Sequence, residues 1–328
     1  MDRMLFANRA CTILYNYLLS HSAKSGYWLL PLNSCPIVPI TFLTAGVPFK
    51  FVDIESSTLC MDRNLVLNVI DDRTCLGLLF IYSYGVDLPF DQFFKKIKNI
   101  REDITIIEDK CLCPPSFEEK DKSTYSDLCL YSTGYAKYVD IGFGGFALAS
   151  TDVGYRKHPT HFDQSTSDGI VTEYKKCLKN TELLNKPGVS WIDDRPLMMN
   201  KKEYIDTVQV EKKKAVNQKK LLNSVYKANI PSSIWLEVEG APVDAWRFNL
   251  LVPFSKEEFI ERIEAEDLFV SSHYKPVDQI FNNEVIGSGH VAYSVFNRII
   301  NLFNDKYFCE THAEIVSDII KQFFYQKA

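Results

Sequence analysis

The chain has 328 residues, of which 46% are hydrophobic and 24% charged, and its formal net charge is −5. These values are typical of a globular protein with a large apolar core, and the length favours two domains. The acidic balance and the absence of a basic tail argue against nucleic acid as a partner, because phosphate binding needs clustered Lys and Arg. No apolar run reaches the ~18 residues of a membrane span, and the first residues lack a signal-peptide core, so we expect a cytoplasmic protein without a membrane partner.

Cysteine usage favours reduced thiols over a disulfide framework. There are nine cysteines, an odd number, and most of them lie in apolar runs. Cys111 and Cys113 form the one close pair in the sequence, and a zinc site would need a second pair at a suitable spacing. We therefore expect no metal centre.

A helix is predicted shortly after the N-terminus, with Asn8 as its candidate N-cap. Arg9 would then lie in the first turn, where a cation opposes the helix dipole unless an anion is also present. Asn8, Arg9 and Ala10 are therefore either a phosphate cradle or an exposed arginine in a frayed turn. Five apolar residues share one face of this helix: Ala10, Ile13, Leu14, Tyr17 and Leu18.

Short apolar strands then alternate with helical stretches. Continuous apolar strands of this kind are typical of a mostly parallel sheet that is covered by helices on both faces. We expect strands at 27–30, 49–53, 76–81, 104–107 and 128–131, and helices at about 34–44, 62–71 and 89–100.

Polar residues follow two neighbouring strands of this sheet. Asp109 ends the strand at 104–107, Ser132 ends the strand at 128–131, and Lys137 follows five residues later. Ligands of such sheets bind beyond the carboxyl ends of the strands, so the three side chains can converge on one pocket. Taken singly, Asp109 and Ser132 are ordinary turn residues, and Lys137 is a surface lysine on a hairpin tip.

Lys137 also precedes a glycine cluster, Gly142, Gly144 and Gly145, that leads into the apolar run 146–149. A strand rather than a helix follows these glycines, so they are unlike a nucleotide-binding loop. We expect them to let the backbone pass close to a ligand. A desolvated lysine has a lowered pKa and is then a usable amine nucleophile.

The remainder of the chain differs in character. Residues 151–200 are polar and irregular, and His158 and His161 lack a third metal ligand. A charged helix is expected at 201–227, followed by a smaller α+β unit with strands at 233–238 and 246–252. Capping boxes at 255–258 and 311–314 would each open a helix. We place a large α/β domain at residues 1–195 and a small α+β domain at 196–328.

Taken together, these segments resemble the DegT-like sugar aminotransferases, which are fold-type-I enzymes that use pyridoxal 5′-phosphate (PLP). The resemblance covers nearly the whole chain in order, although no single motif decides it. It is carried by residues 45–49, 51–54, 82–87, 106–109, 132–145 and 272–274.

The resemblance implies a role for each matching residue. Lys137 would form the Schiff base with PLP, and Asp109 would pair with the protonated ring nitrogen. The cofactor phosphate would contact Ser132 and the helix start at Asn8, Arg9 and Ala10. His273 and Tyr274 resemble the small-domain pair near the substrate.

The chain also departs from the family pattern. Cys35 stands near the place of the aromatic ring that stacks on PLP, and Leu112 replaces a polar residue. The family's partner-subunit Asn-x-Arg motif survives as 193–195, where Arg195 is the expected substrate contact. Asp193 would repel a phosphate there unless Arg195 or Arg9 compensates for its charge.

The resemblance implies an aminotransferase of sugar biosynthesis, of the kind that makes polysaccharides or antigens, which acts as a homodimer. It would move an amino group, from glutamate, to a keto sugar linked to a nucleotide. The short segment before Asn8 and the additional Arg9 leave open a small phosphorylated ketone as the acceptor. The changes at Cys35 and Leu112 leave open a non-catalytic relative that kept the fold. The sequence does not identify the sugar or the carbon that is aminated.

Overall fold

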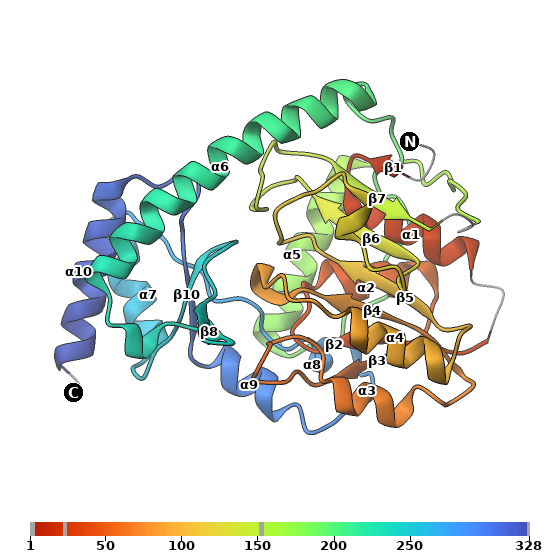
Figure 1. Cartoon of the computed structure of the whole chain (residues 1–328), viewed down its shortest axis with the longest axis horizontal. Coiled ribbons are helices and arrows are strands. Elements are labelled where there is room, and N and C mark those ends of the chain that lie inside the picture. Colours follow the sequence, from red (N-terminus) through yellow and green to blue (C-terminus); the bar gives the residue numbers. More distant parts are fainter. Residues whose placement is uncertain (1–3, 22–24, 151–153, 327–328) are drawn as a thin grey trace.

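A computed structural model describes residues 4–21, 25–150 and 154–326 of the chain. Figure 1 shows two parts, a large sheet covered by helices and a smaller group of elements around the C-terminal end of the long helix α6 (Lys201–Asn229). We call the smaller group the small lobe; it consists of the C-terminal half of α6 with α7 (Lys256–Glu264), α10 (Glu310–Gln326), β10 (Phe248–Leu251) and β12 (Ile299–Leu302).

The large sheet has eight strands in the order β1-β7-β6-β5-β4-β2-β3-β11. The strands from β6 through β11 run parallel, whereas β7 is antiparallel to both β6 and β1. The predicted mostly parallel sheet is therefore confirmed, and every strand expected from an apolar run is present. The bounds are β1 Met4–Ala7, β2 Tyr27–Pro31, β3 Phe49–Val52, β4 Cys75–Ile81, β5 Thr105–Asp109, β6 Leu128–Ser132, β7 Gly145–Ala149 and β11 Val285–Ile286.

Helices cover both faces of the sheet because successive strand residues point to opposite sides. On β4, Leu79 packs in the cluster that contains α1 (Ala10–Ser20) and α2 (Ile37–Ala45). Its neighbours Leu78 and Phe80 pack in the cluster that contains α3 (Arg63–Val69) and α4 (Asp91–Ile100). Burial on both faces explains why these strands read as continuous apolar runs.

The small lobe has its own apolar cluster. Phe248 and Leu250 of β10 pack with Ile300 of β12, and α6, α7 and α10 supply the remaining side chains. Ser255 caps α7 by accepting a hydrogen bond from the backbone N–H of Glu258, as the sequence predicts. The remaining minor elements are β8 (Glu237–Val238) and β9 (Ala241–Pro242), which pair with each other, and α8 (Asp278–Phe281) and α9 (His290–Phe296), whose buried residues belong to the main apolar cluster around the large sheet. Whether the domains divide at residue 195 stays a prediction.

Four local predictions are wrong. The strand expected at 233–238 is a short 3-10 turn (Ser232–Ile234) followed by the two-residue strand β8. The stretch 164–180 is the helix α5 (Gln164–Asn180), which Asp163 caps, rather than irregular chain. Helix α10 begins at Glu310, so Thr311 lies inside it and does not cap it. The N-cap of α1 is Arg9 rather than Asn8, because the Asn8 side chain is bonded elsewhere.

Among the described residues, no helix is both long enough and apolar enough to cross a bilayer. The same part of the chain holds no cluster of three or more His, Cys, Asp or Glu that is arranged to bind a metal ion.

Candidate active site

Asp109 and Ser132 lie at the carboxyl ends of the adjacent parallel strands β5 and β6, where Asp109 pairs in register with Leu130. Asp109 is only 6% exposed, and its Oδ1 accepts a 2.9 Å hydrogen bond from the backbone N–H of Cys111. Ser132 is half-buried, and its hydroxyl has one long contact, at 3.5 Å, with the N–H of Gly134. Both side chains therefore lie at the sheet edge, and each keeps hydrogen-bonding capacity for a ligand.

Lys137 lies in the tight turn that follows β6. Its backbone N–H approaches the carbonyl oxygen of Gly134 at 3.4 Å, and the preceding residue, Ala136, has a φ of 58°. The turn is held by Asp140, which accepts from the Ala136 N–H at 3.0 Å, and by the indole of Trp246, which donates to the Ala136 carbonyl at 2.8 Å. Within the described part of the chain, no hydrogen bond or ion pair holds the Lys137 amine, so the amine has no fixed protein partner.

The pKa of Lys137 shifts in the direction opposite to the one expected from the sequence. Burial lowers the pKa of Lys137, but the thiols of Cys111 and Cys35 and the carboxylate of Asp109 raise it, and the net shift is upward. Asp109 and Lys137 thus lie within electrostatic range of each other. The protein without a ligand holds the amine as an ammonium, and the lowered pKa expected from desolvation alone is wrong.

The start of α1 packs against the start of β7, whose first residue is Gly145. Gly145 pairs in register with Ser132, and a Cβ at Gly145 would lie 2.6 Å from the Cα of Ala10. Only glycine permits this approach, which brings the first N–H groups of α1 to the same sheet edge as the Ser132 hydroxyl. A helix N-terminus beside a hydroxyl is an arrangement suited to a phosphate.

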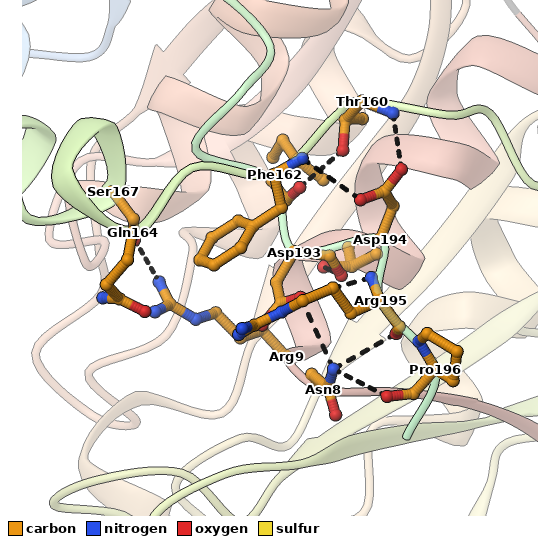
Figure 2. Close-up of polar contacts among 12 residues, drawn as sticks. Asn8, Arg9, Thr160, Phe162, Gln164, Ser167, Asp193, Asp194, Arg195 and Pro196 are labelled. Atoms are coloured by element: carbon orange, nitrogen blue, oxygen red, sulfur yellow. Dashed lines mark hydrogen bonds and ion pairs between the residues drawn. The ribbon is translucent and has the colours of Figure 1, made fainter. Parts of the chain in front are cut away.

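The side chains of Asn8 and Arg9 are bonded to later parts of the chain, as Figure 2 shows. Asn8 Nδ2 donates to the carbonyl oxygens of Arg195 at 3.1 Å and Pro196 at 3.0 Å. Arg9 Nη1 donates to the Ser167 hydroxyl of α5 at 2.8 Å. The backbone at Ala10 is thus free to meet an anion, whereas the two preceding side chains fasten α1 to later parts of the chain.

Asp193 and Arg195 form a bidentate ion pair, with Nε–Oδ1 at 2.8 Å and Nη2–Oδ2 at 2.7 Å (Figure 2). Burial raises the pKa of Asp193, but hydrogen bonds from Arg195 and Asn8 lower it, and the net shift is downward. The Arg195 side chain is 57% exposed and lies over the Phe162 ring, 4.3 Å from its centroid. The expected compensation of Asp193 by Arg195 is therefore present.

Aromatic residues surround the lysine on the small-lobe side. The backbone N–H of Tyr274 donates to the Tyr84 hydroxyl at 3.3 Å, and the Tyr274 ring stacks on Trp246 with centroids 6.3 Å apart. Desolvation and the charges of Arg247 and Lys137 lower the pKa of His273, so this ring is neutral near pH 7. His273 thus lies within electrostatic range of Lys137, whereas the expected role of His273 and Tyr274 near the substrate stays a prediction.

The two departures flagged by the sequence also lie here. Cys35 is half-buried just before α2, and the charge of Lys137 acts on its thiol, while burial raises the pKa of Cys35. Leu112 is 5% exposed within the main apolar cluster. Cys35 thus lies within electrostatic range of the lysine. Its thiol stands where the resemblance implies an aromatic ring.

Sequence reasoning missed three residues of this region: Trp246, Arg247 and Tyr174 of α5. Burial and the nearby Cys35 raise the pKa of Tyr174 to about 12. Trp246 and Arg247 were assigned only to a strand. For Tyr174 a signal existed, since Ile170, Tyr174 and Cys177 recur at helical spacing.

The architecture is that of the fold-type-I PLP-dependent transferases, with which solved structures agree over nearly the whole chain. An aminotransferase of the DegT/DnrJ/EryC1/StrS group from Brucella abortus is 15% identical, with a TM-score of 0.67 over 98% of this chain and 85% of that one. A sugar aminotransferase from Streptococcus pneumoniae, described as putative and in its pyridoxamine phosphate form, is 14% identical, with a TM-score of 0.69 over 99% and 88%. A GDP-4-keto-6-deoxymannose-3-dehydratase with bound GDP-perosamine is 14% identical, with a TM-score of 0.66 over 97% and 88%.

At these identities the agreement defines the fold and not the activity. No family model matches the sequence, and a search of curated proteins also gives no match.

Proposed function

We propose that this protein is a PLP-dependent aminotransferase that transfers an amino group to a keto sugar. The observation that carries the proposal is the amine of Lys137, which has no hydrogen-bond or ion-pair partner among the described residues and lies within electrostatic range of the buried Asp109 carboxylate, at the carboxyl edge of the parallel sheet. A structural lysine at this depth would be expected to have an acceptor for its N–H groups.

The residues present fit the cofactor. The weakly engaged hydroxyl of Ser132 and the N–H groups at the start of α1 would suit its phosphate, and Gly145 lets the start of α1 approach the sheet closely enough for both to lie at one edge. Asp109 suits a protonated ring nitrogen, and Lys137 suits the aldehyde carbon. Cys35 supplies sulfur contact rather than ring stacking on one side.

When bound, PLP supplies an electron sink for carbanion chemistry. Asp109 supports that sink by holding a negative charge at the ring nitrogen. The amine of Lys137 would act as general base and acid, taking the proton from the donor Cα and delivering it to the aldehyde carbon of the cofactor. Trp246 and Tyr274 exclude water from this space.

The decisive experiment adds PLP to the purified protein and records the absorbance band of the lysine-bound cofactor. Wild type should show the band, and Lys137→Ala should lack it, whereas a variant at the exposed residue Lys120, Lys120→Ala, should keep it. Asp109→Asn retains an acceptor for the Cys111 N–H, so it should fold normally yet transfer amino groups about a hundredfold more slowly or worse. A wild type without the band would refute the proposal.

Glutamate as the donor and a nucleotide-linked sugar as the acceptor are further parts of the proposal. They are supported by the neighbours, which include sugar aminotransferases and an enzyme with bound GDP-perosamine. The alternative of a small phosphorylated ketone loses part of its motivation, because the Arg9 guanidinium is engaged by Ser167. Comparing turnover of nucleotide-linked keto sugars with that of keto phosphates separates the two acceptors. Conversion of the cofactor to its amine form by glutamate would rule out a non-catalytic relative.

A further inference from the structure

The loop at 133–144 carries the candidate lysine, and we call it the lysine loop. Backbone hydrogen bonds close this loop at its base. The N–H of Thr133 donates to the carbonyl oxygen of Gly144 at 3.0 Å, and the N–H of Ile141 donates to the carbonyl oxygen of Thr133 at 3.0 Å. The N–H of Gly144 donates to the carbonyl oxygen of Asn8 at 2.6 Å, which ties the base of the loop to the residue before the N-cap of α1.

The side chain of Thr133 adds a further bond at the base of the lysine loop, and a residue of α6 completes it. Thr133 is fully buried, and its Oγ1 lies 2.8 Å from the carbonyl oxygen of Phe143 and 2.6 Å from the Tyr204 hydroxyl. A carbonyl oxygen can only accept, so Thr133 donates its one hydroxyl proton to Phe143 and must accept from Tyr204. The Tyr204 phenol therefore holds the hydroxyl that closes the loop.

The packing of Tyr204 does not require its hydroxyl. The ring meets Phe6 of β1 and Phe146 of β7 edge-on, with centroids 5.8 and 6.4 Å away, and a phenylalanine ring would make the same contacts. A Cβ at Gly144 would lie 2.5 Å from Tyr204 Cε2, so a glycine is needed for the ring to come this close to the lysine loop. Because Tyr204 is fully buried, an unpaired phenol there would be costly. The bond to Thr133 is thus what distinguishes tyrosine from phenylalanine at this position.

Helix α6, which runs from the large sheet to the small lobe in Figure 1, meets the lysine loop a second time. The Lys219 amine lies 5.0 Å from the centroid of the Tyr138 ring and donates to the carbonyl oxygen of Trp246 at 2.8 Å. Trp246 in turn donates its indole N–H to the carbonyl oxygen of Ala136. One helix therefore holds the base of the loop through Tyr204 and, through Lys219 and Trp246, the residues on either side of the lysine.

We propose that Tyr204 is a positioning residue that fixes Lys137 relative to the sheet edge formed by Ser132 and the start of α1. The inference rests on the proposed PLP chemistry, in which one rigid cofactor must meet Lys137 at its aldehyde carbon and that sheet edge at its phosphate. Thr133 directly follows Ser132 in the chain, so a shift at the base of the loop changes the separation of these two contacts. Small errors of placement cost much rate where reacting groups must be aligned.

The first test compares Tyr204→Phe with Tyr226→Phe. Both residues are fully buried on α6, and Tyr226 donates to the carbonyl oxygen of Phe303 at 2.7 Å in the small lobe, so each variant loses one buried phenol bond. Tyr204→Phe should weaken PLP binding and slow the single turnover with glutamate, each about tenfold, without raising the half-saturating glutamate concentration. Tyr226→Phe should lower the Tm and leave these quantities unchanged. Equal PLP binding and equal turnover in the two variants would overturn the proposal.

Variants of Thr133 test whether the two hydroxyls act through one bond. Thr133→Ser keeps an oxygen that accepts from Tyr204, so it should retain the PLP affinity of wild type, whereas Thr133→Val should lose it. Adding Tyr204→Phe to Thr133→Val should cause no further loss, because the bond is already broken. Additive losses in the double variant would contradict a shared bond and with it the proposal.

Hydrogen exchange provides a test that needs neither PLP nor turnover. In the protein without cofactor, the N–H groups of Ile141 and Gly144 should exchange about tenfold faster in Tyr204→Phe than in wild type, because the base of the loop opens more often. Tyr226→Phe should leave both groups unchanged. Unaltered exchange in Tyr204→Phe would show that the phenol does not hold the loop, against the proposal. If wild type binds no PLP, the proposed function fails, and the exchange measurement still decides whether Tyr204 holds the lysine loop.

Discussion

The indole N–H of Trp246 donates a 2.8 Å hydrogen bond to the carbonyl oxygen of Ala136, the residue before Lys137. Ala136 has a positive φ of 58°, a conformation that residues other than glycine rarely adopt. This hydrogen bond joins Trp246, just before strand β10 of the small lobe, to the turn that follows β6. The small lobe thereby fixes the peptide that aims the lysine.

Trp246→Phe should keep the ring against Tyr274 and lose the N–H donor. We expect kcat to fall about tenfold or more with little change in the KM of the donor, because the lysine is less well placed. Stability should fall by about 1 kcal/mol, since the Ala136 carbonyl loses its partner. The matched control is Trp235→Phe, which removes a 3.2 Å bond to Ile230 elsewhere in the small lobe. An equal loss of kcat in both variants would show that the effect is not local.

Gly145→Ala should disturb the contact between β7 and α1. The new Cβ would lie 2.6 Å from the Cα of Ala10 and 2.9 Å from the carbonyl carbon of Arg9, both backbone atoms that cannot turn aside. We expect a loss of about 1–3 kcal/mol in urea unfolding, together with weaker retention of PLP. Gly169→Ala on α5 meets nothing within 4 Å and should be neutral or stabilising. Normal PLP affinity in Gly145→Ala would contradict the phosphate cradle.

The stability of the protein should rise with pH above neutrality because of Lys219. Burial lowers the pKa of Lys219 to about 7, against about 10.4 in an unfolded chain. Between these values the unfolded state binds the extra proton, so the free energy of unfolding increases with pH, by up to about 1.4 kcal/mol per unit.

Urea titrations at pH 7 and pH 9 measure this effect. Lys219→Met should remove the increase, and Lys202→Met, at an exposed position of the same helix, should keep it. The same increase in Lys219→Met would mean that other groups cause it.

Arg195 should contribute its side chain to the active site of a second subunit, as the homodimer expected from the resemblance implies. Its side chain is 57% exposed, and Asp193 orients it. Lys137→Ala and Arg195→Ala should each be weakly active alone. Refolded together, they should recover about a quarter of wild-type activity, since half of the dimers would contain one intact site. Absence of recovery in a mixture of proven dimers would place Arg195 in the site of its own subunit or outside it.

The sequence was sufficient where structure depends on local pattern. Apolar runs predicted the parallel strands, and with them the position of Asp109 and Ser132 at neighbouring strand ends. That Lys137 joins them in one active site stays a prediction. It was insufficient where distant segments decide the outcome. Asn8 turns away from the helix start because carbonyl groups at Arg195 and Pro196 accept its N–H groups. Trp246 reaches the turn across 110 residues, and no spacing rule anticipates such a contact.

The short strand β11 has a consequence for how the chain could be divided. Between β10 and β12, which pair with each other, the chain leaves the small lobe, adds Val285–Ile286 to the edge of the large sheet beside Phe51 and Val52, and returns. Asp53 at the end of β3 then accepts from the N–H groups of Val291 and Ala292 at the start of α9. A fragment cut before the small lobe would lack these partners, so the two parts should unfold in one cooperative transition.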